Sequence, residues 1–161
     1  MAEQVIKLCG EQQLFIATAE SLTGGLVASE LASISGASKV LLGSVVAYQN
    51  SIKQQLLGVS GALIANQSAV DPEVCAQMAQ GIREKFAKAS GLDVASVIGL
   101  STTGVAGPES VSGHEAGEVF IGISSNSGVA VFSERFFGSR NEVRRATVER
   151  SIEILREHLS R

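Results

Sequence analysis

Ser21 places a hydroxyl group at a predicted strand-to-helix turn, just before backbone amides that would point outward. Residues 20–25 follow a short apolar run and have the composition of a turn that leads into a helix. Backbone amides at such a strand-to-helix turn can hold a phosphate group or the oxyanion of an acyl transfer. A serine that caps a helix, followed by glycines that allow close packing, would give the same sequence, so both interpretations stay open.

A second segment, residues 48–53, begins with Tyr48, the only tyrosine in the chain, and ends with Lys53. Lysine becomes a base when burial or a nearby cation lowers its pKa from about 10.4 toward neutrality. The alternative is a solvated surface lysine beside an interfacial tyrosine. From these residues alone, the solvated lysine is the more ordinary interpretation.

A third segment, residues 101–108, combines three hydroxyl side chains with two glycines and a proline after an apolar run. Such a segment can cradle polar ligand groups, and it can equally be an ordinary loop. The sequence contains neither a Walker A motif nor the dinucleotide fingerprint after its first predicted strand. Ser21 lies in no G-x-S-x-G elbow, and no S-x-x-K motif occurs. General motif rules therefore name no enzyme.

Composition narrows the class of protein. The 161 residues are 45% hydrophobic and 18% charged, with a net charge of −3, which is typical of a globular chain. A nucleic-acid-binding protein usually shows a basic excess, which is absent here. Charged residues interrupt every apolar run of residues 1–30, and no run approaches the roughly 18–20 apolar residues of a membrane span. We expect a cytoplasmic protein that binds neither nucleic acid nor membranes.

Cysteine and histidine are scarce, which limits the possible chemistry. Cys9, Cys75, His114 and His158 match no zinc-binding spacing, so we expect no metal. Free cysteines in a reducing compartment pack as small hydrophobic residues, so we expect no disulfide. With two histidines in loop and terminal positions, a Ser-His-Asp triad also fits poorly.

The elements that would position the three segments alternate along the chain. Hydrophobic periodicity and capping signals predict helices and strands in an order typical of a three-layer α/β/α sandwich, as one domain over residues 1–161. A late hairpin makes the α/β sheet mixed and mostly parallel. Ligands bind beyond the carboxyl ends of strands in such sheets, where the three segments would meet. We expect helices over 2–12, 26–36, 50–57, 72–90 and 140–159, strands over 14–19, 40–48, 94–100, 119–125 and 129–136, and a loop over 101–117.

Five separated motifs, taken together, resemble the CinA C-terminal domain family, in the family's order from about residue 15 to 155. Family members also exist as the C-terminal part of longer proteins with a molybdopterin-binding-like domain, and this chain resembles the stand-alone form. The motifs are TAESLTGG at 18–25, VVAYQNSIK with LLGV at 45–59, AV at 69–70, TGVAGP at 103–108, and FGSR with VR at 137–144.

The resemblance implies a cofactor-independent nicotinamide-nucleotide amidase, which converts nicotinamide mononucleotide and water to nicotinate mononucleotide and ammonia. It assigns Ser21 as the nucleophile, Lys53 as the general base and Tyr48 as the hydrogen-bonding companion of the lysine. Family members are often dimeric, so it also suggests a homodimer. The substrate-binding residues expected are Leu22, Thr23, Gly24 and Gly25, whose amides would form the oxyanion hole, Thr102, Thr103 and Gly104, and Arg140 for the phosphate.

Several points leave alternatives open. Leu22 stands where the family commonly has cysteine, and residues 109–117 lack the usual Lys-Pro-Val-Gly ending, with Glu115 adding a negative charge. Arg144 could bind the phosphate, or hold the last helix in place through a carboxylate. The rival functions are a nucleotide-binding module without catalysis and an amidase for another small amide.

Overall fold

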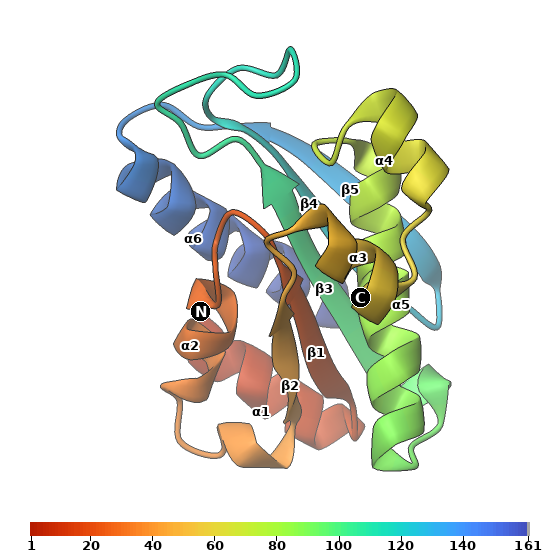
Figure 1. The fold of residues 1–161 in the computed structure, drawn as a ribbon. Coiled ribbons are helices and arrows are strands. Elements are labelled where there is room, and N and C mark those ends of the chain that lie inside the picture. The colour runs from red at the N-terminus through yellow and green to blue at the C-terminus, as the bar shows by residue number, and fades with distance from the viewer. Residues whose placement is uncertain (161) are drawn as a thin grey trace.

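The computed structural model describes residues 1–160, which form a five-stranded sheet between two layers of helices (Figure 1). The strand order is β2-β1-β3-β4-β5. The central β1 pairs in parallel with β2 and β3, whereas β4 runs antiparallel to both β3 and β5. Four of the five strands thus point the same way, which confirms the mixed, mostly parallel sheet. The strands are β1 (Phe15–Glu20), β2 (Leu41–Val46), β3 (Val97–Gly104), β4 (Glu118–Ser125) and β5 (Gly128–Arg135).

Helices cover both faces of the sheet because alternate strand residues point to opposite sides. Ile16 of β1 joins the core under α1, α2 and α6, while Ala17 joins the core under α3, α4 and α5. These two cores confirm the three-layer sandwich. The helices are α1 (Ala2–Gln12), α2 (Leu26–Ala32), α3 (Asn50–Leu57), α4 (Gly61–Gln67), α5 (Pro72–Ser90) and α6 (Arg140–Leu159), with short 3₁₀ helices at Ala37–Lys39 and Val94–Ser96.

Capping residues define the start of the two longest helices. The Asp71 side chain accepts hydrogen bonds from the amides of Glu73 and Val74, with Pro72 at the first helical position, as the sequence predicts. At the start of α6, Ser139 and Glu142 form a reciprocal capping box. This cap fixes where α6 begins, and so where Arg140 lies.

The structure corrects several predicted boundaries: α2 ends at Ala32 rather than at residue 36, and β2 ends at Val46 rather than at residue 48. Residues 101–104, expected to belong to a loop, continue β3, where Ser101 and Thr102 pair with β1 and β4. The strand also begins later than expected, because Asp93 caps a short 3₁₀ helix before it. The helix α4 was not predicted at all; Ser60 caps it by accepting from the Leu63 amide.

One glycine allows the close packing that positions α3. A Cβ atom at Gly81 of α5 would lie 1.9 Å from the carbonyl oxygen of Leu57, the last residue of α3. Only a residue without a side chain permits this approach. Lys53 is carried on α3, so the contact with α5 also sets the height of that lysine above the sheet.

Within residues 1–160, no helix has both the length and the apolar character that crossing a bilayer requires.

Candidate active site

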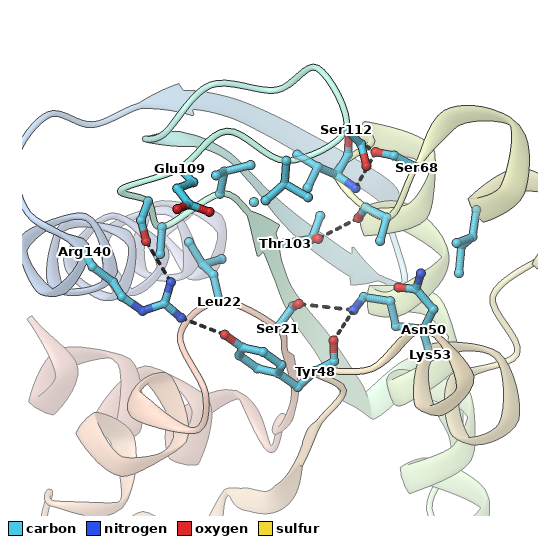
Figure 2. A pocket seen from close by; sticks show the side chains of 18 of the residues that line it. Ser21, Leu22, Tyr48, Asn50, Lys53, Ser68, Thr103, Glu109, Ser112 and Arg140 are labelled. Atoms are coloured by element: carbon cyan, nitrogen blue, oxygen red, sulfur yellow. Dashed lines mark hydrogen bonds between the residues drawn. The ribbon is translucent and has the colours of Figure 1, made fainter.

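A cavity of about 590 Å³ lies beyond the carboxyl ends of β1, β2 and β3 (Figure 2). It brings together the three segments that the sequence singled out, as expected for an open α/β sheet. The segment after α4 and the loop after β3 close its other sides. The lining comes from residues 21–22, 48–53, 64–70 and 103–112, and from Arg140.

Ser21 and Lys53 lie within proton-transfer distance at the floor of this cavity. Ser21 follows β1 directly, and its amide donates to the carbonyl of Thr102 at 2.9 Å. Lys53 extends from α3, and its side chain is almost fully buried, with the residue only 1% exposed. The distance from Lys53 Nζ to Ser21 Oγ is 3.2 Å. The two residues assigned as nucleophile and base are therefore in contact.

The surroundings of Lys53 make its neutral form more accessible than it is in water. Its Nζ donates to the backbone carbonyls of Ala47 at 2.7 Å and Tyr48 at 3.2 Å. When charged, the amine also donates to Ser21 Oγ. When neutral, it keeps two hydrogens for the two carbonyls, and its lone pair can accept from the Ser21 hydroxyl. Burial lowers the pKa of Lys53 to about 8, because the charged form loses its hydration. Within residues 1–160, no carboxylate forms an ion pair with it.

Tyr48 contacts the lysine through its backbone rather than through its hydroxyl. Its carbonyl oxygen accepts from Lys53, whereas its phenol oxygen accepts from Arg140 Nη2 at 2.7 Å. The ring lies along one wall between these two partners (Figure 2). Tyr48 therefore contacts Lys53 through its backbone carbonyl, whereas its phenol group is hydrogen-bonded to Arg140.

Arg140 lines the cavity at the start of α6. Besides its bond to Tyr48, it donates from Nη1 to the carbonyl of Gly107 at 2.9 Å. Two neutral acceptors therefore hold the guanidinium in place without cancelling its charge. A planar guanidinium held in this way is suited to binding an anionic group such as a phosphate.

The hydroxyl residues of β3 have separate partners. Thr103 lines the cavity, and its Oγ1 donates to the carbonyl of Ala69 at 2.7 Å, which ties the segment after α4 to the strand. Gly104 also lines the cavity. Thr102 does not; its Oγ1 lies 2.8 Å from that of Thr23, and both side chains are buried. The structure therefore gives Thr102 and Thr23 no direct place on the cavity wall.

Glu20, a fully buried carboxylate beside Ser21, is not among the site residues that the sequence predicts. Its carboxylate accepts from the amides of Gly25, Val27 and Ala28 at 2.8–3.0 Å and from the Thr23 hydroxyl at 2.7 Å. A carboxylate is favourable at a helix N-terminus, because the first amides of a helix have no internal acceptor. The sequence signal that could have identified Glu20 is an acidic residue at the end of an apolar strand and just before a helix.

The hydrogen bonds of Glu20 reduce the number of amides that can form the expected oxyanion hole. The Gly25 amide donates to Glu20, and the Gly24 amide donates to the Ser21 carbonyl at 3.2 Å, so neither is available to a substrate. The amides of Leu22 and Thr23 have no acceptor within residues 1–160. Of the four residues expected to bind through this loop, only Leu22 lines the cavity.

Arg144 contacts this same loop from α6. It was expected to bind a phosphate or a carboxylate, but it donates to the carbonyls of Leu22 and Thr23, each at 3.0 Å. It does not line the cavity. Of the two arginines considered for an anionic substrate, the structure brings only Arg140 to the wall.

The loop after β3 folds over the cavity as a small hairpin. Val111 and His114 form an isolated antiparallel bridge, and His114 Nδ1 lies 2.8 Å from a carboxylate oxygen of Glu118. Glu115 forms an ion pair with Arg135 and does not line the cavity. Its negative charge is therefore not on the cavity wall. Glu109 is the carboxylate that does line the cavity.

Comparison with known proteins identifies the family. The CinA C-terminal domain model matches residues 1–159. The chain belongs to this family. Solved structures share the fold of this CinA domain: a CinA superfamily protein from Klebsiella pneumoniae aligns with a TM-score of 0.88 at 26% identity, covering 99% of this chain and 95% of the other. A competence/damage inducible protein from Agrobacterium tumefaciens aligns at 0.82 and 28% identity, covering 98% and 96%.

Relatives with longer chains contain the same domain. A putative competence-damage inducible protein from Bacillus subtilis is 44% identical over 137 residues, which cover 85% of this CinA domain and 31% of the relative. The corresponding protein of Shouchella clausii is 45% identical over 149 residues, covering 92% and 34%. The chain thus spans about a third of the length of these curated relatives.

Proposed function

We propose that this CinA domain is an amidase that hydrolyses the carboxamide of nicotinamide mononucleotide to nicotinate mononucleotide and ammonia. The observation that carries the proposal is the 3.2 Å contact between Ser21 Oγ and Lys53 Nζ, whose other neighbours are two carbonyl acceptors. A buried amine with a lowered pKa beside a serine is the arrangement of an activated nucleophile.

The reaction divides into two acyl-transfer steps. Ser21 Oγ attacks the carboxamide carbon while its proton passes to the neutral Lys53. The resulting tetrahedral intermediate expels ammonia, which takes that proton from Lys53, and an acyl ester remains on Ser21. Lys53 then removes a proton from water, the water oxygen attacks the ester, and the proton returns to Ser21 as nicotinate mononucleotide leaves.

Arg140 and Lys53 are the basic residues that line the cavity, and Glu109 is the carboxylate that lines it. Because Lys53 contacts Ser21, we assign Arg140 to the phosphate of a nucleotide substrate. The amide of Leu22, which lines the cavity and lacks a protein acceptor within residues 1–160, is assigned to the oxyanion of the tetrahedral intermediate. Thr103 and Gly104 contribute to the wall beside the nucleophile.

Ammonia release from nicotinamide mononucleotide, measured for the unmodified chain and for Ser21→Ala, tests the proposal. We expect release with the first and none above background with the second, with both variants equally stable to heat. Binding of the nucleotide without ammonia would instead indicate a nucleotide-binding module. A panel that includes nicotinamide and NAD distinguishes this substrate from another small amide, because release from a different amide alone would reject the assignment.

A further inference from the structure

Glu109 is the one acidic residue among those of residues 1–160 that line the cavity. Its carboxylate forms no hydrogen bond or ion pair within that part of the chain. The two acids that follow it have partners. Glu115 forms an ion pair with Arg135. A carboxylate oxygen of Glu118 lies 2.8 Å from His114 Nδ1. Glu109 is therefore the acid of this loop whose charge remains available to a ligand.

The segment that carries Glu109 is held on both sides. Before it, the carbonyl of Gly107 accepts from Arg140 Nη1 at 2.9 Å. After it, Val111 and His114 exchange two backbone hydrogen bonds, of 3.0 and 2.9 Å. The carboxylate is thus presented by a backbone that is already in place, so a ligand would have little of the loop to order.

The cavity wall presents charges of both signs to one ligand. The guanidinium of Arg140 donates to two neutral acceptors, the phenol of Tyr48 and the carbonyl of Gly107, and these leave its charge in place. Figure 2 shows Glu109 and Lys53 on opposite sides of the cavity, which both residues line. A wall with an available cation and an available anion complements a ligand that itself carries both charges.

The proposed substrate has such a charge distribution. Its pyridine nitrogen is bonded to the ribose and carries a positive charge, whereas its phosphate is negative. The carboxamide on the same ring has to reach Ser21 Oγ, which lies 3.2 Å from Lys53 Nζ. The cationic ring therefore has to bind beside a basic residue. Glu109 is the acid on the wall that can offset the charge of the ring.

We infer that Glu109 determines the charge specificity of the cavity, by favouring ligands with a cationic ring. In taking nicotinamide mononucleotide as the ligand, this role rests on the proposed function. Glu109 acts on binding and takes no part in the acyl transfer. Coulomb attraction falls only as the inverse of distance, so the carboxylate need not touch the ring. The same charge disfavours the product, because hydrolysis adds a carboxylate to the ring.

Two ligands that differ in ring charge test this role. Nicotinamide mononucleotide has a cationic ring. Its reduced form, which has gained a hydride, has a neutral ring with the same carboxamide, ribose and phosphate. Their dissociation constants are measured by calorimetry in the Ser21→Ala background, where we expect no turnover. The ratio of the two constants isolates the ring, because the phosphate and the ribose contribute to both.

Three substitutions are compared in this background. Glu109→Gln removes the charge, Glu109→Asp keeps it, and Glu115→Gln is the matched control at an exposed position of the same loop that does not line the cavity. We expect the preference for the cationic ring to fall about 3- to 10-fold in Glu109→Gln and less than about 2-fold in the other two. Added salt should weaken the preference of the parent protein. Nicotinate mononucleotide should bind more tightly to Glu109→Gln than to the parent.

An unchanged ratio in Glu109→Gln would overturn the inference, and so would an equal fall in Glu115→Gln or Glu109→Asp. Melting temperatures show whether each variant is folded, as we expect for changes at exposed positions. Ammonia release by the unmodified chain separates the two proposals. Release together with an unchanged ratio rejects the role of Glu109 alone, whereas a ratio that falls as expected without any release rejects the catalysis alone. If neither nucleotide binds, both proposals are rejected.

Discussion

Tyr48 and Arg140 are joined by a hydrogen bond of 2.7 Å from the guanidinium to the phenol oxygen, although they lie 92 positions apart. The backbone carbonyl of the same tyrosine accepts a bond from Lys53. One residue thus connects the cation at the start of α6 with the amine on α3. The two contacts use different atoms of Tyr48, so they can be separated by mutation.

Tyr48→Phe removes the contact with Arg140 and keeps the carbonyl that binds Lys53. We expect the KM for nicotinamide mononucleotide to rise about 2- to 10-fold, the effect of one lost hydrogen bond that helps to order Arg140. The pH at which kcat/KM reaches half its maximum should not move. Steady-state ammonia release across a pH series measures both quantities, and a shifted midpoint would mean that the phenol also acts on Lys53.

The lowered pKa of Lys53 predicts the pH dependence of the activity. Lys53 acts as a base only when neutral, and its pKa is about 8, so kcat/KM should rise with pH and level off above that value. A profile that falls between pH 7 and 9 would contradict a neutral lysine as base.

Lys53→Arg tests the same point by mutation. Arginine stays protonated at every pH of the assay, so we expect turnover to fall at least ~100-fold. Lys39→Arg, which makes the same change at an exposed lysine, is the control and should keep full activity. Comparable turnover by the two variants would remove Lys53 from the role of base.

Glu20→Gln should destabilise the domain by about 1–3 kcal/mol, because the new NH₂ group would face amides that need an acceptor. Urea denaturation of the variant and the unmodified chain measures the difference. Glu30→Gln makes the same change at an exposed position of α2 and should leave the free energy of unfolding nearly unchanged. Equal effects of the two substitutions would show that the buried carboxylate contributes little.

Gly81→Ala should lower both stability and activity, because its methyl group would collide with the Leu57 carbonyl and push α3 away from α5. Overpacking of this kind typically costs about 1–3 kcal/mol. In Gly10→Ala the new methyl group meets nothing within 4 Å, so this variant of α1 should gain stability by roughly 0.5–1 kcal/mol. Thermal melts and ammonia release compare the pair, and full activity in Gly81→Ala would argue against the link between this contact and Lys53.

Local sequence signals were sufficient to predict much of the fold. The Asp-Pro-Glu start of α5 and the bounds of α3 are local features, because capping and helix ends depend on a few neighbouring residues. The end of β3 was missed for a tertiary reason. Its hydroxyl groups look like loop residues, but Ser101 donates to the Cys75 carbonyl and Thr103 to the Ala69 carbonyl, so they are tolerated in the interior.

The site was harder to predict than the fold. The resemblance to a family assigned Ser21 and Lys53, since no local spacing rule brings residues 32 positions apart into contact. Hydrogen bonds within the folded turn decide which amides of the loop remain available: Glu20 occupies the amide of Gly25, and the Ser21 carbonyl occupies that of Gly24. A pattern of residue types cannot show which of several amides already has an acceptor.

The acceptors of Lys53 are close to it in sequence as well as in space. Ala47, Tyr48 and Lys53 lie within seven consecutive residues, whereas Ser21 comes from another segment. A small shift of this segment relative to β1 would therefore alter the distance to the serine and leave the two carbonyl contacts of the amine almost unchanged. A partner that presses on α3 should accordingly slow turnover while the midpoint of the pH profile stays constant.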